Sequence, residues 1–147
     1  MKSKENIIII DSNFILLPFQ FKIDYLSEIR NQIEGELKFV IFQQIFDELE
    51  AKKRRERKAT KYQRLLDAGL LFLEKNKTKY NLEIVEEIKE DYETTDMFLL
   101  RKANELKRED RRVFLATNDS DLRRRARILG LNMIFLRQKS YLSIERS

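Results

Sequence analysis

Acidic side chains in four separate segments of the sequence are of the type that can hold a divalent cation. They are Asp11 in IIIIDSN, Glu48 in IFDELE, Asp96 in ETTDMF, and Asp119 with Asp121 in ATNDSDL. Two of these segments come directly after apolar runs that are typical of buried strands. If those strands are parallel neighbours, carboxylates from distant parts of the chain meet at one edge of one sheet. Because crowded carboxylates repel each other, such a cluster must bind protons or a cation.

The absence of histidine and cysteine narrows the chemistry of such a site. Without histidine, a Ser-His-Asp triad is excluded. Without cysteine, disulfides, a thiolate nucleophile and a zinc–sulfur site are excluded as well. An all-oxygen site remains, and it suits Mg²⁺ or Mn²⁺. We therefore expect one of these two ions as the cofactor.

The size and composition of the chain fit one globular domain. The sequence has 147 residues, of which 42% are hydrophobic, so residues 1–147 are expected to form a single domain. The longest apolar runs are far shorter than a membrane span. The apolar run near the N-terminus is too short for a signal peptide and ends in an aspartate. These features predict a cytoplasmic protein that makes no use of a membrane.

Short apolar runs alternate with helical patterns along the chain. The runs predict strands at 6–10, 37–41, 82–85, 113–116 and 133–136. Helical spacing predicts helices at 23–33, 42–49, 59–76, 96–106 and 119–129, with a loop or short helix at 14–21. This alternation predicts the α/β class, with a mostly parallel central sheet of about five strands. Sites in such sheets form outside the carboxyl ends of the strands, where Asp11 and Asp119 are expected to lie.

Asp11 and the Asp119 segment each have a structural alternative. The tripeptide Asp-Ser-Asn favours turns and helix caps, although Asn13 is also placed to orient Asp11 by a hydrogen bond. Asn118 is a good N-cap with Asp121 three residues later, so helix capping alone accounts for both. Asp119 is therefore the better candidate for a metal ligand, and Asp121 is either a second ligand or binds through water.

Glu48 lies beside the apolar stripe of its predicted helix. At roughly 100° per residue, Asp47 points almost opposite that stripe and is interpreted as a solvated residue. Glu48 lies at the flank of the stripe, from which a side chain can reach the sheet. Its structural alternative is an ion pair with Lys52, four residues later. The local sequence favours neither interpretation of Glu48, as a residue of the site or as the partner of Lys52.

Asp96 is the acid whose position is hardest to explain by structure alone. It shares a helical face with Leu99, Leu100 and Ala103, so it projects from the buried side of its helix. An Asp in the first turn, after a cap at Thr94 or Thr95, would satisfy the helix dipole. That alternative explains why Asp96 lies in the first turn, but it does not explain why Asp96 lies on the buried face of the helix. A buried acid needs a partner. We favour a functional role.

Two basic runs accompany the acidic segments. They contain Lys52, Lys53, Arg54, Arg55, Arg57 and Lys58 in the first run, and Arg123, Arg124, Arg125 and Arg127 in the second. A polyanionic substrate explains cations on either side of an acidic metal site, because they would bind the flanking phosphates. The alternative is a solvated helix face. Aromatic residues such as Phe14, Phe19, Tyr62 and Tyr92 could stack on bases, although packing in the core is the default for each.

The order of the acidic segments resembles that of the PIN-domain ribonucleases over nearly the whole chain. The matching features are strand–D-S-N, helix–E, T-D at a helix start and strand–T-N-D-x-D. By this resemblance, Asp11, Glu48, Asp96 and Asp119 match the catalytic acidic quartet of the family, and Asp121 its common fifth acid. The resemblance implies a three-layer α/β/α fold and metal-dependent endoribonuclease activity on RNA. We expect Asn13, Thr117 and Asn118 to orient the ligand residues.

The C-terminal third indicates a branch of the family. The segments TNDSDLRRRAR and IFLRQKSYLSIE are more similar to the branch that cleaves precursor ribosomal RNA in the small-subunit processome than to VapC-type toxins. The Cys/His zinc-binding elements of several ribosome-processing relatives are absent here. A toxin restrained by an antitoxin and a non-catalytic RNA-binding scaffold are the alternatives. The implied protein partner is accordingly a ribosome-assembly factor or an antitoxin, and the apolar face of the 59–76 helix could support a homodimer.

Overall fold

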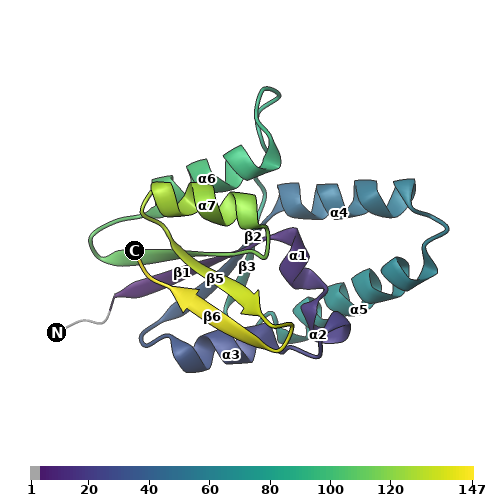
Figure 1. Ribbon diagram of the computed structural model, residues 1–147, viewed down its shortest axis with the longest axis horizontal. Helices are drawn as coiled ribbons and strands as arrows, with labels where there is room; N and C mark the ends of the chain where they lie inside the picture. The colour runs from purple at the N-terminus through teal and green to yellow at the C-terminus, as the bar shows by residue number, and fades with distance from the viewer. Residues whose placement is uncertain (1–3) are drawn as a thin grey trace.

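A six-stranded sheet forms the centre of the computed structural model, which describes residues 4–147 (Figure 1). The strands are β1 (Glu5–Ile10), β2 (Leu37–Phe42), β3 (Leu82–Val85), β4 (Arg111–Ala116), β5 (Asn132–Arg137) and β6 (Tyr141–Glu145). Their order in the sheet is β3-β2-β1-β4-β5-β6. The pairs among β1 to β5 are all parallel, and β6 is antiparallel to β5. The predicted α/β class and mostly parallel sheet are confirmed.

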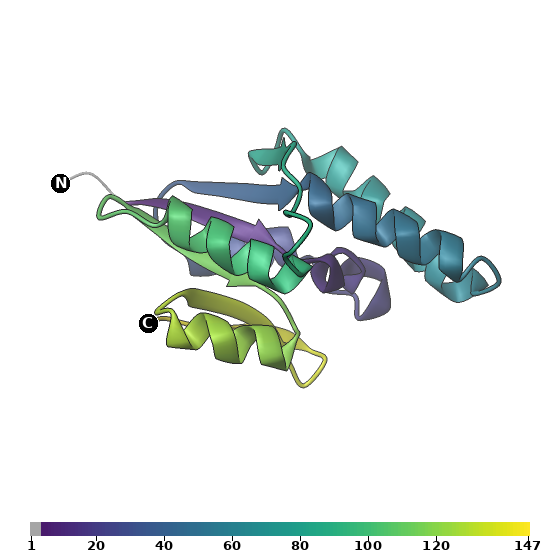
Figure 2. The ribbon, with the colours of Figure 1, turned by 90° about the horizontal axis from the view of Figure 1, so that it is seen from above.

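Helices cover both faces of the sheet. They are α1 (Ser12–Ile15), α2 (Leu17–Gln20), α3 (Tyr25–Gln32), α4 (Gln43–Arg55), α5 (Thr60–Asn76), α6 (Thr95–Leu106) and α7 (Ser120–Ile128). Figure 1 shows α6 and α7 above the sheet and α3 below it, which gives the expected three layers. Seen from above in Figure 2, α4 and α5 run side by side as a hairpin that projects beyond the ends of the strands. Across residues 4–147, no helix has the length and apolar character needed to cross a membrane.

The sheet has one strand more than the five that the apolar runs predict. β6 alternates in burial, with Leu142 buried and Tyr141 exposed, so it has no apolar run. The turn before it places Gln138 and Lys139 at φ angles of 51° and 54°. Two-residue hairpin turns of this kind usually contain Asn or Gly, which tolerate positive φ. The hairpin therefore lacks its usual sequence signal.

The central position of β1 fixes where Asp11 lies. Residues 7–10 are buried, and β1 pairs with β2 on one side and with β4 on the other. Ile10 is the register partner of Ala116, and the Asp11 amide donates a hydrogen bond of 3.0 Å to the Ala116 carbonyl. Asp11 and Thr117 consequently leave the sheet side by side. An edge-to-face contact between Phe42 and Phe98, with ring centroids 5.2 Å apart, packs β2 against α6 at the same end.

A glycine brings α1 close to α5. A Cβ atom built on Gly69 would lie 2.2 Å from the backbone oxygen of Ile15, which is far inside van der Waals contact. Only a residue without a Cβ allows the two backbones to approach so closely. Because Asp11 immediately precedes α1, this contact also helps to fix the start of that helix.

Gly69→Ala is therefore expected to destabilise the protein by about 2 kcal/mol, the usual size of an overpacking penalty. Alanine gains about 1 kcal/mol of helix propensity over glycine, but the backbone oxygen cannot rotate away from the new methyl group. The free energy of unfolding in urea measures the effect. Glu74→Ala, at an exposed position of the same helix, is the control. A Gly69→Ala variant as stable as the wild type would show that the helices separate without cost.

Candidate active site

Asp11 is a buried carboxylate held by three hydrogen bonds. It is the N-cap of α1 and only 5% exposed. Its Oδ1 accepts a hydrogen bond of 2.7 Å from the Ser12 amide. Its Oδ2 accepts hydrogen bonds from the Thr117 hydroxyl at 2.7 Å and from Asn13 Nδ2 at 3.2 Å. The structure thus combines both interpretations of Asp11, since it caps a helix and also lies at the carboxyl end of the central strand.

Two loops are joined by the side chains of Asn13 and Thr117. Asn13 Oδ1 accepts a hydrogen bond of 3.0 Å from the Asn118 amide. Thr117 Oγ1 accepts one of 3.1 Å from the Asp119 amide while its hydroxyl donates to Asp11. The loop after β1 and the loop after β4 are therefore fixed relative to each other. Asn13 and Thr117 contact Asp11 directly, and Asn118 joins the network only through its backbone amide, so the orienting role of the three residues stays a prediction.

Asp119 rather than Asn118 is the N-cap of α7. Asp119 Oδ1 accepts hydrogen bonds from the amides of Asp121 at 2.9 Å and Leu122 at 3.0 Å. Asn118 Oδ1 instead accepts a hydrogen bond of 2.8 Å from the Leu136 amide of β5. The predicted N-cap at Asn118 is wrong, because its side chain is committed to the neighbouring strand. Asp119 is exposed, and the capping bonds use only one of its two carboxylate oxygens.

Asp121 is exposed and already paired with arginines of its own helix. It forms an ion pair with Arg124, and Arg125 lies 4.0 Å from its other oxygen. The hydrogen bond from Arg124 lowers the pKa of the Asp121 carboxyl. Its role as a fifth metal ligand stays a prediction.

Glu48 faces the start of α6. It is half-buried, and one of its carboxylate oxygens accepts a close hydrogen bond from the Thr95 hydroxyl. Lys52 lies over the ring of Tyr62, 4.6 Å from its centroid. Among residues 4–147 no Glu48–Lys52 ion pair is present, so that alternative is wrong. Asp47 is exposed, as its position on the helix predicts.

Asp96 is half-buried in the first turn of α6. Thr94 is the N-cap of the helix and accepts a hydrogen bond of 3.1 Å from the Met97 amide. The preceding loop is fastened by Arg101, which donates two hydrogen bonds of 2.8 Å to Glu93. Asp96 is therefore not needed as the cap, and it lies near enough to Asp119 and Asp11 for their charges to raise its pKa.

The four acids of the proposed quartet influence one another through space. Burial raises the pKa of Asp11 most, and repulsion from Glu48 and Asp119 adds to it, while hydrogen bonds from Thr117 and Ser12 oppose the shift. Burial also raises the pKa of Asp96, and repulsion from Asp119 and Asp11 adds to it. Acids from β1, α4, α6 and the loop before α7 thus form one negative cluster at the carboxyl ends of the strands.

The donor atoms of this cluster fit a hard divalent cation, although their side chains are not gathered around one point. Within the described part of the chain, no three acidic side chains lie close enough together to hold an ion as they stand. Glu48 accepts a hydrogen bond from Thr95, and Asp119 accepts hydrogen bonds from the amides of α7. Both are exposed or half-buried and can rotate, whereas Asp11 is fixed. Oxygen ligands with excess negative charge are the set that Mg²⁺ and Mn²⁺ prefer.

Comparison with known proteins assigns the chain to a family. The model of the family described as "PIN like domain" matches residues 8–139. The chain belongs to the PIN-like domain family. Domains of this family are in general nucleases, and these nucleases generally use divalent metals such as Mg²⁺ or Mn²⁺. A comparison with curated protein sequences finds no significant match.

Two solved structures show the same fold as this PIN-like domain. One is described as "Structure of the PIN domain endonuclease Utp24"; it has 20% sequence identity and a TM-score of 0.65, with 96% of this chain and 92% of that chain covered. The other is described as a domain of a functionally unknown protein from Methanocaldococcus jannaschii, with 17% identity, a TM-score of 0.65 and 99% of both chains covered. The identities are low, so these similarities support the fold alone.

The first basic run of the PIN-like domain lies at the free end of the α4–α5 hairpin. Arg54, Arg55, Arg57 and Lys58 are exposed, and within residues 4–147 none of them forms an ion pair. Lys53 is paired with Asp67 at 3.1 Å. A hollow of about 250 Å³ is lined by Ser12, Glu48, Leu49, Ala51, Lys52 and Arg55. Arg55 is therefore the free cation that shares a hollow with Glu48, whereas Arg54 and Arg57 line a separate hollow with Glu50.

Most arginines of the second basic run already contact other side chains of the domain. Arg123 lies over the ring of Phe135 at 4.2 Å, Arg124 is paired with Asp121, and Arg127 donates to Glu145 at 2.7 Å. Two arginines act on the acids of the site: the charge of Arg125 opposes the rise in the pKa of Asp96, and Arg123 interacts with Asp119. Of the two runs, the first offers more free positive charge.

Sequence reasoning did not find Thr95 as a partner of Glu48. The sequence pattern predicts Thr95 only as a possible cap of α6, because it lies next to the start of the helix. Its contact with Glu48 joins α4 to α6, and Gln44 adds a hydrogen bond of 3.4 Å to the same hydroxyl. The sequence does contain a signal for this contact. Two threonines precede Asp96 and a helix needs only one of them as its cap, so the hydroxyl of the other is left to bond elsewhere.

Asp96→Asn is expected to raise the melting temperature of the metal-free protein at neutral pH. The raised pKa means that the folded state binds this proton more tightly than the unfolded chain, so the ionised carboxylate weakens the fold above the folded-state pKa. The neutral amide removes that penalty. The gain should vanish below about pH 4, where the carboxyl is protonated in both states.

Thermal unfolding with a chelator, at neutral and acidic pH, measures this difference. Asp47→Asn is the matched control, because Asp47 is exposed and lies outside the cluster. An Asp96→Asn variant that is less stable than the wild type at neutral pH would mean that the carboxylate has a cationic partner within the fold.

Proposed function

We propose that the protein is a Mg²⁺- or Mn²⁺-dependent endoribonuclease that hydrolyses RNA phosphodiester bonds. The observation that supports it most is the electrostatic influence of Asp119 on both Asp11 and Asp96, beyond the carboxyl ends of the strands, together with that of Glu48 on Asp11. These acids come from four separate parts of the chain, and the pKa of Asp11 stays raised by burial although three hydrogen bonds reach its carboxylate. Membership in a family whose members are in general nucleases supports the same conclusion.

The residues of the site have separate roles in this proposal. Asp11, Asp96 and Asp119 supply carboxylate oxygens for the ion, Asp121 is a candidate for a further one, and Glu48 completes the quartet from α4. Such an ion lowers the pKa of a bound water and stabilises charge on the phosphate. Asn13 and Thr117 keep the Asp11 carboxylate in a fixed orientation through their hydrogen bonds, and Asn118 ties the loop to β5. No side chain needs to act as a covalent nucleophile.

RNA is the proposed substrate because of the cations beside the acids. Arg54, Arg55, Arg57 and Lys58 have no ionic partner among residues 4–147, and Arg55 lines a hollow that also contains Glu48. Phosphates on either side of the cleaved bond would supply the missing negative charge. Of the α7 arginines, Arg125 is the best placed to contact the substrate, because it lies close enough to act on Asp96.

Processing of precursor ribosomal RNA is the cellular role that we favour. The C-terminal segments are more similar to that branch of the family, and the structure titled a PIN domain endonuclease covers nearly the same length. A ribosome-assembly factor would then be the protein partner. A toxin paired with an antitoxin differs in one observable respect, since its expression would arrest growth and an active-site substitution would relieve the arrest.

The first expected outcome is Mn²⁺-stimulated cleavage of RNA that is lost in two variants. Asp11→Asn and Asp96→Asn should each reduce the cleavage rate by more than about 100-fold, because each removes a charged ligand oxygen. Asp47→Asn should cleave at the wild-type rate. Gel assays with single-stranded and structured RNA measure the rates. Undiminished cleavage by the two variants would remove the proposed site, and RNA binding with no turnover on varied substrates would favour a scaffold.

The second expected outcome concerns the tip of the α4–α5 hairpin. The double variant Arg54→Ala/Arg57→Ala should bind single-stranded RNA more weakly, with a slope of log K against log salt that falls by about 0.7 for each lost phosphate contact. Arg127→Ala is the matched control, because its guanidinium is already paired with Glu145. Fluorescence anisotropy over a series of salt concentrations measures both slopes. Equal slopes for the double variant and the wild type would place the RNA elsewhere.

A further inference from the structure

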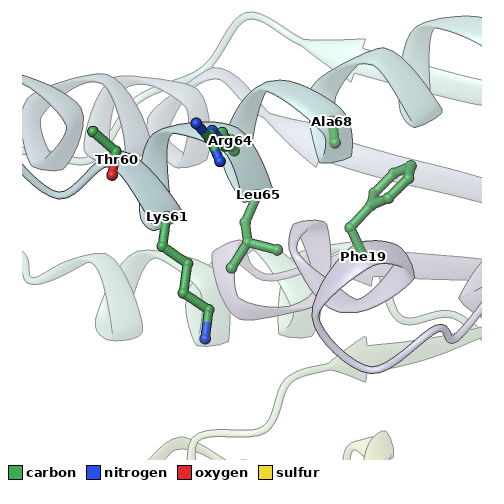
Figure 3. A pocket seen from close by; sticks show the side chains of 6 residues that line it. All are labelled: Phe19, Thr60, Lys61, Arg64, Leu65 and Ala68. Carbon is green, nitrogen blue, oxygen red and sulfur yellow. The ribbon is translucent and has the colours of Figure 1, made fainter.

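A second hollow lies between α2 and α5, outside the acidic cluster. Its volume is about 390 Å³, and it is lined by Phe19, Thr60, Lys61, Arg64, Leu65 and Ala68. Figure 3 shows Phe19 rising from α2 toward Ala68, with Leu65 extending from α5 between Phe19 and Lys61. The volume is in the range of small-molecule sites and is too small for a helix of a partner protein. The hollow therefore fits a single flat group.

The chemistry of the hollow is an aromatic face surrounded by free positive charge. Phe19 is 53% exposed, although a large aromatic side chain is normally buried. Lys61 and Arg64 are exposed, and neither forms an ion pair in the part of the chain that the structure describes. No acidic side chain lines the hollow. An aromatic base attached to phosphates is complementary to both features.

The other aromatic residues that could stack on bases do not combine these two features. Phe14 is fully buried against Tyr25, and the ring of Tyr62 is covered by Lys52. Tyr92 is exposed but follows Glu90 and Asp91, whose charges repel phosphates. Among these four aromatic residues, Phe19 is thus the exposed one that is accompanied by cations.

The hollow is close to the acidic cluster and is held in a fixed shape. Phe19 follows Asp11 by eight residues, so the chain can separate them by at most about 28 Å. The short helices α1 and α2 fill this interval, and α1 contacts both α4 and α5. The close approach of Gly69 to Ile15 fixes α5 against the segment that carries Phe19. A short stretch of single-stranded RNA can reach from one site to the other.

We propose that this hollow binds one unstacked base of single-stranded RNA by stacking on Phe19, on the same strand as the cleaved bond and at most about 28 Å from Asp11. Lys61 and Arg64 contact the phosphates on either side of that base. A base in a duplex has both faces covered by its neighbours, so the hollow selects RNA that is single-stranded at this position. This subsite extends the proposed ribonuclease and depends on it for its biological purpose. Stacking tolerates all four bases, so it gives a preference for structure rather than for sequence.

Binding measured without divalent metal separates this subsite from catalysis. The probes are a labelled oligouridine single strand and an RNA duplex of the same length, titrated with full-length protein in chelator. Phe19→Ala should weaken binding of the single strand by about 10-fold or more, the usual effect of losing one stacked base, and leave duplex binding unchanged. Phe19→Trp should restore single-strand binding. Leu71→Ala, at a 50% exposed apolar position of α5 outside the hollow, should bind like the wild type.

The outcomes distinguish this subsite from the proposed activity. Loss of single-strand binding in Phe19→Ala supports the subsite even if no metal-dependent cleavage is found. Equal affinity of Phe19→Ala and wild type for the single strand overturns it even if cleavage is robust. An equal loss of single-strand and duplex binding overturns the stacking role. If Phe19→Ala changes the sedimentation coefficient of the protein but not its affinity for RNA, the proposed subsite is overturned, and the hollow is instead an interface between two copies of the protein. Matched melting temperatures of the variants exclude misfolding as the cause.

Discussion

The parallel pairing of β1 with β4 is the constraint on which the site depends. Its register places Ile10 opposite Ala116, so the chain leaves both strands at the same level. Asp11 and Thr117 then meet as the first residues beyond the sheet, and a hydrogen bond of 2.7 Å joins them. Asn13 and the Asp119 amide extend this contact into both loops. A shift of one residue in that register would turn the side chains to opposite faces and break the network.

The charges around this point are separated in space. Acids gather at the strand ends, where burial and mutual repulsion raise the pKa values of Asp11 and Asp96. Free cations lie along the projecting α4–α5 hairpin, and Lys52 and Arg55 reach the hollow beside Glu48. The separation of these opposite charges leaves room for a cation on one side and phosphates on the other, which is the arrangement that a metal-dependent nuclease requires.

The sequence predicts the strands and the positions of most acids, because both follow from local patterns. Buried runs locate the five parallel strands, and the residues after two of them, β1 and β4, include Asp11, Thr117 and Asp119. Contacts between distant segments explain what was not predicted. Asn118 is not a cap because its side chain accepts a hydrogen bond from the Leu136 amide of β5. Arg127 is not free because it donates a hydrogen bond to Glu145, which lies on β6, a strand without an apolar run. The contact of Glu48 with Thr95 likewise joins two helices that are far apart in the chain.

The central claim is that acids from separate segments share one divalent cation. The most direct test is the anomalous diffraction of crystals soaked in Mn²⁺, which locates the ion independently of any activity. The account predicts an anomalous peak in contact with carboxylate oxygens of Asp11, Asp96 and Asp119, with the Asp119 side chain rotated toward Asp11. Carboxylates that stay dispersed, with no peak between them at saturating Mn²⁺, would contradict it.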